Sequence, residues 1–309
     1  MGVTAERIAR KSIHTANGIV NITVLIVILL FIAFSGYALW DSNQLYRGAD
    51  SAQYEIYKPS AENETESFEE LQAINGEVFS WLTVYGTHID YPVTQGEDNA
   101  KYVNTNAYGE YSLAGSIFLD YRNGADFQDF NSILYGHHME KQAMFGEIGS
   151  FGDKDYFDRH QYGNLFFAGK NHGLVFFAFV KTDAYNIDMF TPNIKTPETR
   201  QEYLKNILDV ALYTRDVSVT ADDHILLLTT CAPDATNGRD ILVAKITDDC
   251  YRDMFQRRGT DNASGTQLSK DQQWQRIPLW LKISVPIALL LLLLVIILNH
   301  KKQRNLPKE

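Results

Sequence analysis

Short apolar runs, bounded by turn-forming residues, occupy most of the middle of this 309-residue chain. Such runs predict β-strands, which are short and usually lie between Gly, Pro, Asn, Asp or Ser clusters. The pattern predicts strands at residues 78–84, 89–93, 133–135, 165–167, 174–180, 224–230 and 241–246. Many short strands with few helices indicate a closed or nearly closed β-barrel, so the predicted fold class is mainly β.

Three helices are expected, one before the first strand and two between later strands. The first begins at a capping box, residues 67–70, and ends at Asn75-Gly76. A second, short helix is expected near residues 143–145. The third opens at Thr196, a capping residue, with Pro197 at the first helical position. Its apolar positions recur at three and four residues and form one face: Tyr203, Leu204, Ile207, Leu208, Ala211 and Leu212.

Two longer apolar stretches, residues 19–39 and 279–298, lie outside this pattern. Each is long enough to cross the hydrocarbon layer of a membrane as a helix. The alternative for the first stretch is a cleaved signal peptide, but bulky residues 38–40 replace the small residues of a cleavage site. The alternative for the second is a buried core helix, although basic residues 301–304 follow it as they follow a membrane span. We expect two retained transmembrane helices.

Charge is distributed unevenly along the chain, whose formal net charge is −10. Residues 41–276 hold 20 Lys and Arg against 36 Asp and Glu, whereas both ends carry an excess of basic residues. An acidic middle argues against nucleic acid as a partner, because phosphate binding needs a positive face. The positive-inside rule predicts that both termini are cytoplasmic and that the middle lies outside the cell membrane.

These features predict the organisation of the whole chain along the membrane. The expected segments are a cytoplasmic tail (1–18), a transmembrane anchor (19–40), a juxtamembrane stalk (41–66), a folded domain (67–250), a linker (251–278), a second transmembrane helix (279–298) and a cytoplasmic tail (299–309).

The candidate chemistry lies at the ends of two predicted strands. Cys231 follows an apolar run that ends in two threonines, His137 follows Tyr135-Gly136, and Arg239 comes eight residues after Cys231. A thiol, an imidazole and a guanidinium supply a nucleophile, a proton carrier and an anion-stabilising donor, which suffice for acyl transfer through a thioester. The alternatives are a buried structural thiol for Cys231 and a solvated turn residue for Arg239.

The second cysteine and the adjacent histidine are expected to have no catalytic role. Cys250 follows two aspartates, whose negative charges disfavour a thiolate. His137 and His138 are neighbours on an extended chain, so their side chains point to opposite faces. For the same reason they do not converge on one metal ion, and the chain has no His-Glu-x-x-His or Cys-x-x-Cys motif. We expect neither a metal nor a cofactor.

The residues around Cys231, His137 and Arg239 resemble the active site of sortases, the cysteine transpeptidases of Gram-positive cell surfaces. The resemblance covers about residues 71–246 and is strongest with class B, on the passages at 75–82, 86–93 and 115–123. It implies an eight-stranded barrel, with the third helix in the long connection before the cysteine strand. It also implies that His137, directly after the glycine, is the catalytic imidazole, and that Asn99 and Thr229 line the groove for the substrate peptide.

The implied function is transfer of an acyl group through a thioacyl enzyme. Cys231 attacks the sorting signal of a surface protein, and the acceptor is an amine of a cell-wall precursor or of a pilin lysine. A cysteine hydrolase of cell-wall or surface peptides stays open, because it uses the same nucleophile. A membrane-tethered binding barrel also stays open, although it leaves the three residues unexplained. The second apolar stretch is more typical of class C, whose Asp-Pro-aromatic lid is absent before residue 67.

Overall fold

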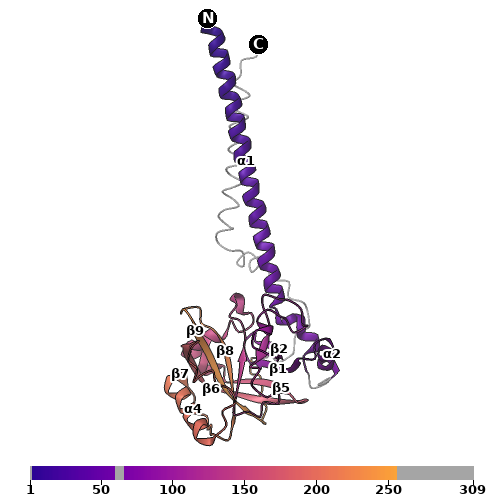
Figure 1. Cartoon of the computed structure of the whole chain (residues 1–309), viewed down its shortest axis with the longest axis vertical. Coiled ribbons are helices and arrows are strands. Elements are labelled where there is room, and N and C mark those ends of the chain that lie inside the picture. The colour runs from indigo at the N-terminus through magenta and orange to yellow at the C-terminus, as the bar shows by residue number, and fades with distance from the viewer. Residues whose placement is uncertain (1, 60–65, 256–309) are drawn as a thin grey trace. The chain divides into compact units, whose positions relative to one another are not determined.

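The computed structural model describes residues 2–59 and 66–255. The chain divides into two units, and the barrel belongs to the unit Asn43–Arg258. The predicted second transmembrane helix (279–298), the tail after it and residues 256–278 of the predicted linker lie outside the described residues. Figure 1 follows the chain through its helices and strands.

The first helix, α1 (Gly2–Gly48), is much longer than the predicted anchor at residues 19–40. No proline occurs between residues 2 and 48 to interrupt its hydrogen bonds, so the helix continues through the polar flanks on both sides. Judged by length and composition, α1 is long and apolar enough to cross a membrane, and it is the one such helix among the described residues.

Residues 49–57 pack against the barrel, although they belong to the segment predicted as a polar stalk. Asp50 caps the 3-10 helix η1 (Ser51–Tyr57) by accepting a hydrogen bond from the backbone N–H of Ala52. Ala49 and Tyr54 are buried. Aromatic and small side chains in this acid-rich stretch therefore stabilise it on the domain surface.

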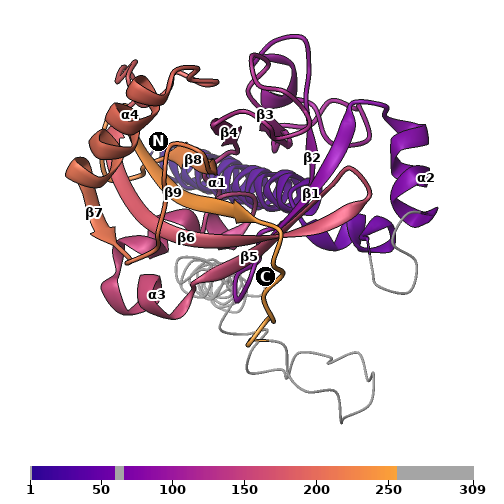
Figure 2. The same cartoon turned by 90° about the horizontal axis from the view of Figure 1, so that it is seen from below.

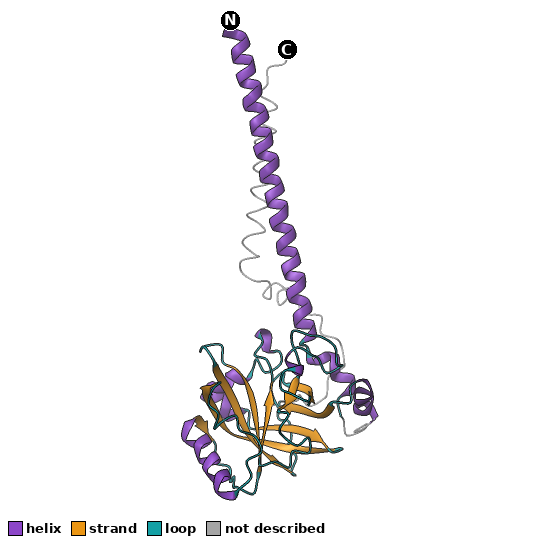
Figure 3. Ribbon diagram, viewed as in Figure 1, coloured by secondary structure: helices purple, strands orange, loops and turns teal. Residues whose placement is uncertain are grey.

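Eight strands form a closed barrel, as predicted. In order around the barrel they are β5 (Tyr162–Phe167), β1 (Val78–Val84), β2 (Asp90–Thr94), β3 (Ile117–Leu119), β4 (Asn131–Tyr135), β8 (His224–Cys231), β9 (Gly238–Thr247) and β6 (Lys170–Asp183). The pairing of β5 with β6 closes the ring, and the short strand β7 (Ala211–Thr214) extends the sheet beside β6. Figure 3 shows the strands of this unit together with the loops and helices that connect them.

Successive residues of β8 pack against two different hydrophobic clusters. Leu226 and Leu228 belong to the core inside the barrel, whereas Ile225 and Leu227 belong to a second cluster on its outer face. Helix α4 (Pro197–Val210) contributes Tyr203 and other residues to the second cluster and lies beside β7, as Figure 2 shows. Because β8 is buried on both faces, its sequence is a continuous apolar run.

The helices agree with the predictions only in part. Helix α2 (Glu66–Ile74) covers the first predicted helix, and Thr196 caps α4 through the N–H of Thr199. Helix α4 ends at Val210, however, and leaves Leu208 and Leu212 exposed. The remaining helical segments are η2 (Lys101–Val103), η3 (Glu140–Gln142), η4 (Ile148–Gly152) and α3 (Lys154–Arg159).

The helix predicted near residues 143–145 is wrong. Met144 has a φ of 52°, a left-handed conformation that a right-handed helix cannot contain. The chain turns there, and its helical segments η4 and α3 begin only at Ile148 and Lys154.

Candidate active site

Cys231 and Arg239 lie directly opposite each other on neighbouring antiparallel strands. Cys231 is the last residue of β8, Arg239 is the second residue of β9, and the two are Cα partners in the register. Directly paired residues point to the same face of a sheet, so the two side chains leave the backbone side by side. Cys231 is an exposed free thiol, and Arg239 is half-buried, with Nη1 donating to the carbonyl of Gly238 at 3.0 Å.

The turn between these residues is stabilised by its own backbone. The N–H of Ala232 donates to the carbonyl of Gly238 at 2.9 Å, and the N–H of Gly238 donates to the carbonyl of Ala235 at 3.1 Å. Asn237 adopts a φ of 60°, a conformation that asparagine tolerates better than most residues. This tight turn keeps the thiol and the guanidinium at the same end of the barrel.

The chain that carries His137 runs parallel to β8. Tyr135, the last residue of β4, is the Cα partner of Thr229. One residue further, the N–H of Gly136 donates to the carbonyl of Thr229 at 3.2 Å, and Thr230 Oγ1 donates to the carbonyl of Gly136 at 2.8 Å. A further step along both chains brings His137 level with Cys231. Adjacent strands lie about 4.8 Å apart, so the structure brings these two residues together at one end of the barrel.

The His137 ring is oriented by a carbonyl from another segment. Its Nε2 lies 2.8 Å from the carbonyl oxygen of Val103, in η2. Because a carbonyl only accepts, Nε2 carries a hydrogen in this contact, and Nδ1 remains to give or take a proton. The main-chain carbonyl of His137 accepts from the N–H of Phe145 at 3.0 Å. Ring and backbone of the half-buried His137 are therefore both held.

A second set of polar groups lies on the inward side of the same strands. Asp240 is the Cα partner of Thr230, and alternation along the strands turns both away from the face of Cys231 and Arg239. Asp240 is 1% exposed, and its carboxylate oxygens have no hydrogen-bond partner among the described residues. Burial raises the pKa of Asp240, and the nearby charges of Lys181 and His138 oppose this without cancelling it. His138 thus acts on Asp240, on the side opposite to the thiol.

Lys181, on β6, connects this inward side with the turn after Cys231. Its ammonium donates to Asp234 in the turn at 2.7 Å and lies 3.6 Å from Asp240 Oδ1. The hydrogen bond with Asp234 raises the pKa of Lys181. The Lys181 ammonium therefore interacts with two carboxylates, that of Asp234 in the turn and that of the buried Asp240.

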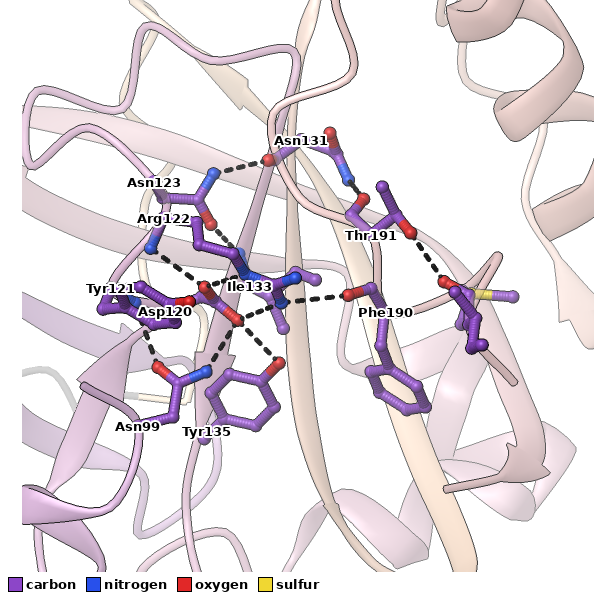
Figure 4. A network of polar contacts seen from close by, with 12 residues as sticks. Asn99, Asp120, Tyr121, Arg122, Asn123, Asn131, Ile133, Tyr135, Phe190 and Thr191 are labelled. Atoms are coloured by element: carbon purple, nitrogen blue, oxygen red, sulfur yellow. Dashed lines mark hydrogen bonds and ion pairs between the residues drawn. The ribbon is translucent and has the colours of Figure 1, made fainter. Parts of the chain in front are cut away.

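Beside the site, a polar network is centred on the buried carboxylate of Asp120, as Figure 4 shows. Arg122 donates to it through Nε and Nη2, both at 2.8 Å, and Tyr135 Oη donates at 3.0 Å. Arg122 Nη2 also lies 3.2 Å from the carbonyl of Phe190, in the connection between β6 and α4. Burial alone would raise the pKa of Asp120, but the donors, chiefly Arg122, outweigh it and lower the pKa. The network holds Tyr135, two residues before His137.

Asn99 belongs to this network and is already engaged at both ends of its amide. Its Nδ2 donates to Asp120 Oδ2 at 2.9 Å, and its Oδ1 accepts from the N–H of Tyr121 at 3.0 Å. Thr229 is 2% exposed, and its Oγ1 has no hydrogen-bond partner within residues 2–59 and 66–255. Asn99 therefore supports the Asp120 network, and Thr229 lies beneath the surface near Cys231. A groove role for either residue stays a prediction.

Sequence reasoning missed Asp120, Arg122, Tyr135 and the Val103 carbonyl. Asp120 and Arg122 are two residues apart, a spacing of opposite charges that occurs in many surface loops and by itself indicates no specific role. Their significance follows from contacts between segments far apart in sequence.

Cys250 lies away from Cys231, His137 and Arg239. Arg239 is near the start of β9, whereas Cys250 follows its last residue, Thr247. A strand of this length spans about 30 Å at the usual rise per residue, so Cys250 is near the opposite end of the barrel. Among the described residues, no group of three or more His, Cys, Asp or Glu side chains is arranged to hold a metal ion.

Comparisons with known proteins identify the family of this chain. No protein-family model matches it. It is 35% identical over 181 residues to a sortase B of Listeria monocytogenes, covering 57% of this chain and 72% of that protein. It is 30% identical over 241 residues to a sortase B of Staphylococcus aureus, covering 74% of this chain and 95% of that protein.

Solved structures agree with these relatives. The sortase B from the type II pilus of Streptococcus pneumoniae is 44% identical with a TM-score of 0.53, covering 59% of this chain and 99% of its own. A Streptococcus pyogenes class B sortase involved in pilus biogenesis is 39% identical with a TM-score of 0.54, covering 58% and 97%. A sortase B complexed with triglycine is 27% identical with a TM-score of 0.61, covering 67% and 99%. The chain therefore belongs to the sortase family of cysteine transpeptidases and is closest to class B.

Proposed function

We propose that this protein is a membrane-anchored transpeptidase in which Cys231, His137 and Arg239 carry the reaction on the sorting signal of a surface protein. The observation that supports this most is the pair of registers that joins the three residues. Cys231 is opposite Arg239 across β8 and β9, and Tyr135 is opposite Thr229 across β4 and β8. A nucleophile, a proton carrier and a fixed cation thus lie at one barrel end, where the thiol is exposed.

In the first half of the reaction, the Cys231 thiolate attacks a backbone carbonyl carbon of the sorting signal. A C–S bond forms, the C–N bond breaks, and His137 gives its proton to the departing amine. The negative charge that develops on the carbonyl oxygen is stabilised by Arg239, which is charged at every physiological pH. The product of this half is a thioester between Cys231 and the amino-terminal part of the substrate.

In the second half, an acceptor amine attacks the thioester carbon. It loses a proton to His137, a C–N bond forms, and the Cys231 thiolate leaves. Proton transfer by a positioned imidazole contributes about 10²- to 10⁴-fold in rate. Each group is thus restored to its starting state after one cycle.

We further propose that α1 is a retained membrane anchor and that the catalytic domain lies outside the cell. The apolar part of α1 and the basic residues before it support this orientation. The second span predicted at residues 279–298 completes the topology with both termini in the cytoplasm. Labelling of a cysteine engineered into an exposed barrel loop, in intact cells with an impermeant reagent, tests this orientation, and labelling of the terminal tails alone would contradict it.

The proposed acceptor is a primary amine, either an amino-terminal glycine of a cell-wall precursor or a pilin lysine. The solved relatives support both kinds, since one is complexed with triglycine, one is the sortase B from a type II pilus, and one is involved in pilus biogenesis. Both acceptors present the same nucleophile to a thioester.

The deciding experiment incubates the full-length protein in detergent with a library of sorting-type peptides and either triglycine or a lysine peptide. Mass spectrometry then identifies the products. Transpeptidation gives amide-linked products and a covalent intermediate on Cys231. Hydrolysed peptide alone, even at high amine concentration, would support the cysteine hydrolase instead, and Cys231→Ala serves as the inactive control.

A further inference from the structure

The loop after His137 has an unusual backbone conformation. Three of its non-glycine residues have positive φ angles, namely Lys141 (59°), Gln142 (64°) and Met144 (52°). The left-handed region is disfavoured for residues with a Cβ atom, so such angles persist only where surrounding contacts impose them. These contacts are therefore expected to determine where the loop, and with it His137, is held.

The backbone of the loop pairs with the backbone of both histidines. The N–H of Phe145 donates to the carbonyl of His137 at 3.0 Å, and Met144 forms an isolated antiparallel bridge with His138. A change in the position of Met144 would therefore displace both histidines.

A buried tyrosine connects Met144 to the chain that leaves the first helix. Tyr91 Oη, on β2, accepts a hydrogen bond from the N–H of Met144 at 3.0 Å and donates one to the carbonyl of Ala49 at 2.8 Å. Ala49 is 0%, Met144 2% and Tyr91 3% exposed, so water does not compete for these bonds. Burial raises the pKa of Tyr91 to about 12, which keeps the hydroxyl protonated at neutral pH.

A second contact joins the same two segments at the surface. Tyr46, near the end of α1 in the barrel unit, donates through Oη to Glu140 at 3.3 Å. The Lys141 ammonium lies 3.7 Å from the centre of the Tyr46 ring, within cation–π distance. Both partners of Tyr46 belong to η3, which begins two residues after His138.

We propose that Tyr91 is a positioning residue for catalysis, and that it makes residues 46–49 a structural part of the active site. Its hydroxyl fixes Met144 in a disfavoured conformation against the backbone of Ala49. Through Phe145 and Met144, the same hydroxyl fixes the backbone of His137. The proposal rests on the proposed function, because it assigns to Tyr91 the task of holding the catalytic imidazole.

The test compares Tyr91→Phe with Tyr203→Phe in the full-length protein. Tyr203 is the matched control: its buried Oη also donates to a backbone carbonyl, that of Met189, at 2.8 Å, but Tyr203 lies on α4. We expect Tyr91→Phe to lower kcat about tenfold with KM within about twofold, since small displacements of a catalytic group reduce rate more than binding. Tyr203→Phe should leave both constants within about twofold. The melting temperature should fall in both variants, and more in Tyr91→Phe, because the Tyr91 hydroxyl makes two buried hydrogen bonds and the Tyr203 hydroxyl donates one.

Alkylation of Cys231 across a range of pH supplies a readout that a purely structural role would leave unchanged. The rate reports thiolate formation beside the imidazole. The Tyr91→Phe profile should shift from wild type, and the Tyr203→Phe profile should superimpose on it. If Tyr91→Phe fails to fold, Tyr46→Ala tests the second contact between the same two segments, which lies at the surface. A reduced kcat with unchanged KM in that variant supports the proposal, and a wild-type kcat overturns it.

The proposal fails if Tyr91→Phe keeps kcat and the alkylation profile of wild type, or if only KM changes. Cys231→Ala and His137→Ala, measured beside it, separate this failure from that of the proposed function. If Cys231→Ala still forms product, or His137→Ala keeps the kcat of wild type, the proposed function is wrong. If Cys231→Ala is inactive, His137→Ala is strongly slowed and Tyr91→Phe is normal, only the positioning role is wrong.

Discussion

Cys231 and Arg239 are cross-strand partners at the turn end of the hairpin formed by β8 and β9. The Cβ atoms of such partners lie about 4.5–5.5 Å apart, so the backbone determines where the two side chains begin. Both side chains therefore start from one face of the sheet, at the end of β8 where the thiol is exposed. The hydrogen bond from Ala232 to Gly238 closes the turn directly behind them.

Replacement of the two cysteines should have opposite results. Cys231→Ala should abolish product and the covalent intermediate, because no other thiol lies at this end of the barrel. Cys250→Ala should leave turnover within a few-fold of wild type. Mass spectrometry of the trapped enzyme checks both, and substrate found on Cys250 would overturn the assignment of the nucleophile.

Replacement of each of the two adjacent histidines should also have different results. His137→Ala should lower kcat by about 10²- to 10⁴-fold, because the leaving amine then departs without a proton donor. His138→Ala should mainly change stability, since His138 acts on the inward-facing Asp240. Kinetics and thermal melting are measured on both variants. Equal losses of activity in two folded variants would mean that both rings serve the reaction.

Arg239 should tolerate neither removal nor a change of geometry. Arg239→Ala should lower kcat by about 10²- to 10³-fold, the usual effect of losing one oxyanion donor. Arg239→Lys should recover only part of this, because an ammonium lacks the planar fork of donors. Steady-state kinetics with one peptide and one amine measures kcat, which should fall in the order wild type, Arg239→Lys, Arg239→Ala. The control is Lys245→Met. Lys245 also lies on β9 and forms an ion pair with Asp223, and the variant should retain wild-type kcat.

Asp120 should stabilise the fold in a pH-dependent manner. Its pKa is lowered in the folded protein, so its contribution is present above the unfolded pKa of about 4 and is lost as pH falls through the folded value. Asp120→Asn should reduce the free energy of unfolding by about 2 kcal/mol at pH 7, as expected for charge-assisted hydrogen bonds. The difference should shrink at pH 3.

Chemical denaturation at both pH values measures this difference. The control is Asp158→Asn, which removes only an exposed pair with Lys154 and should change stability by less than about 0.5 kcal/mol. The same loss for Asp120→Asn at both pH values would show that charge is not involved.

Asp240 should show the reverse dependence. Its pKa is raised by burial, so the folded wild type loses stability as pH rises from the unfolded pKa through the folded value. Asp240→Asn removes this penalty, and the variant should gain stability relative to wild type at pH 7 but not at pH 3. Thermal melting at the two pH values checks the sign. A variant that is less stable than wild type at pH 7 would contradict it, and would mean that the ion pair with Lys181 outweighs burial.

Local sequence signals were sufficient for much of the barrel and for placing Cys231, His137 and Arg239 near strand ends. The apolar run before Cys231 predicted β8 to within one residue, and Thr196-Pro197 predicted the start of α4. These signals are reliable because a buried strand must be apolar and a helix start must satisfy its free N–H groups. Strand β3 has only three residues, too few for any periodicity to show, and it was not among the predicted strands.

The sequence by itself determined which chemical groups the protein has and near which strand ends they occur. Only the tertiary structure decided their neighbours: the register that brings Tyr135 beside Thr229, the carbonyl of Val103 that orients His137, and the burial of Asp120. Met144 shows the reason most clearly. Its own segment favours a helix, but hydrogen bonds that join Met144 to Tyr91 and Phe145 to His137 hold the loop in a left-handed turn. Contacts between remote segments leave no periodic trace in the sequence, and their combined free energy exceeds the weak local preference that they overrule.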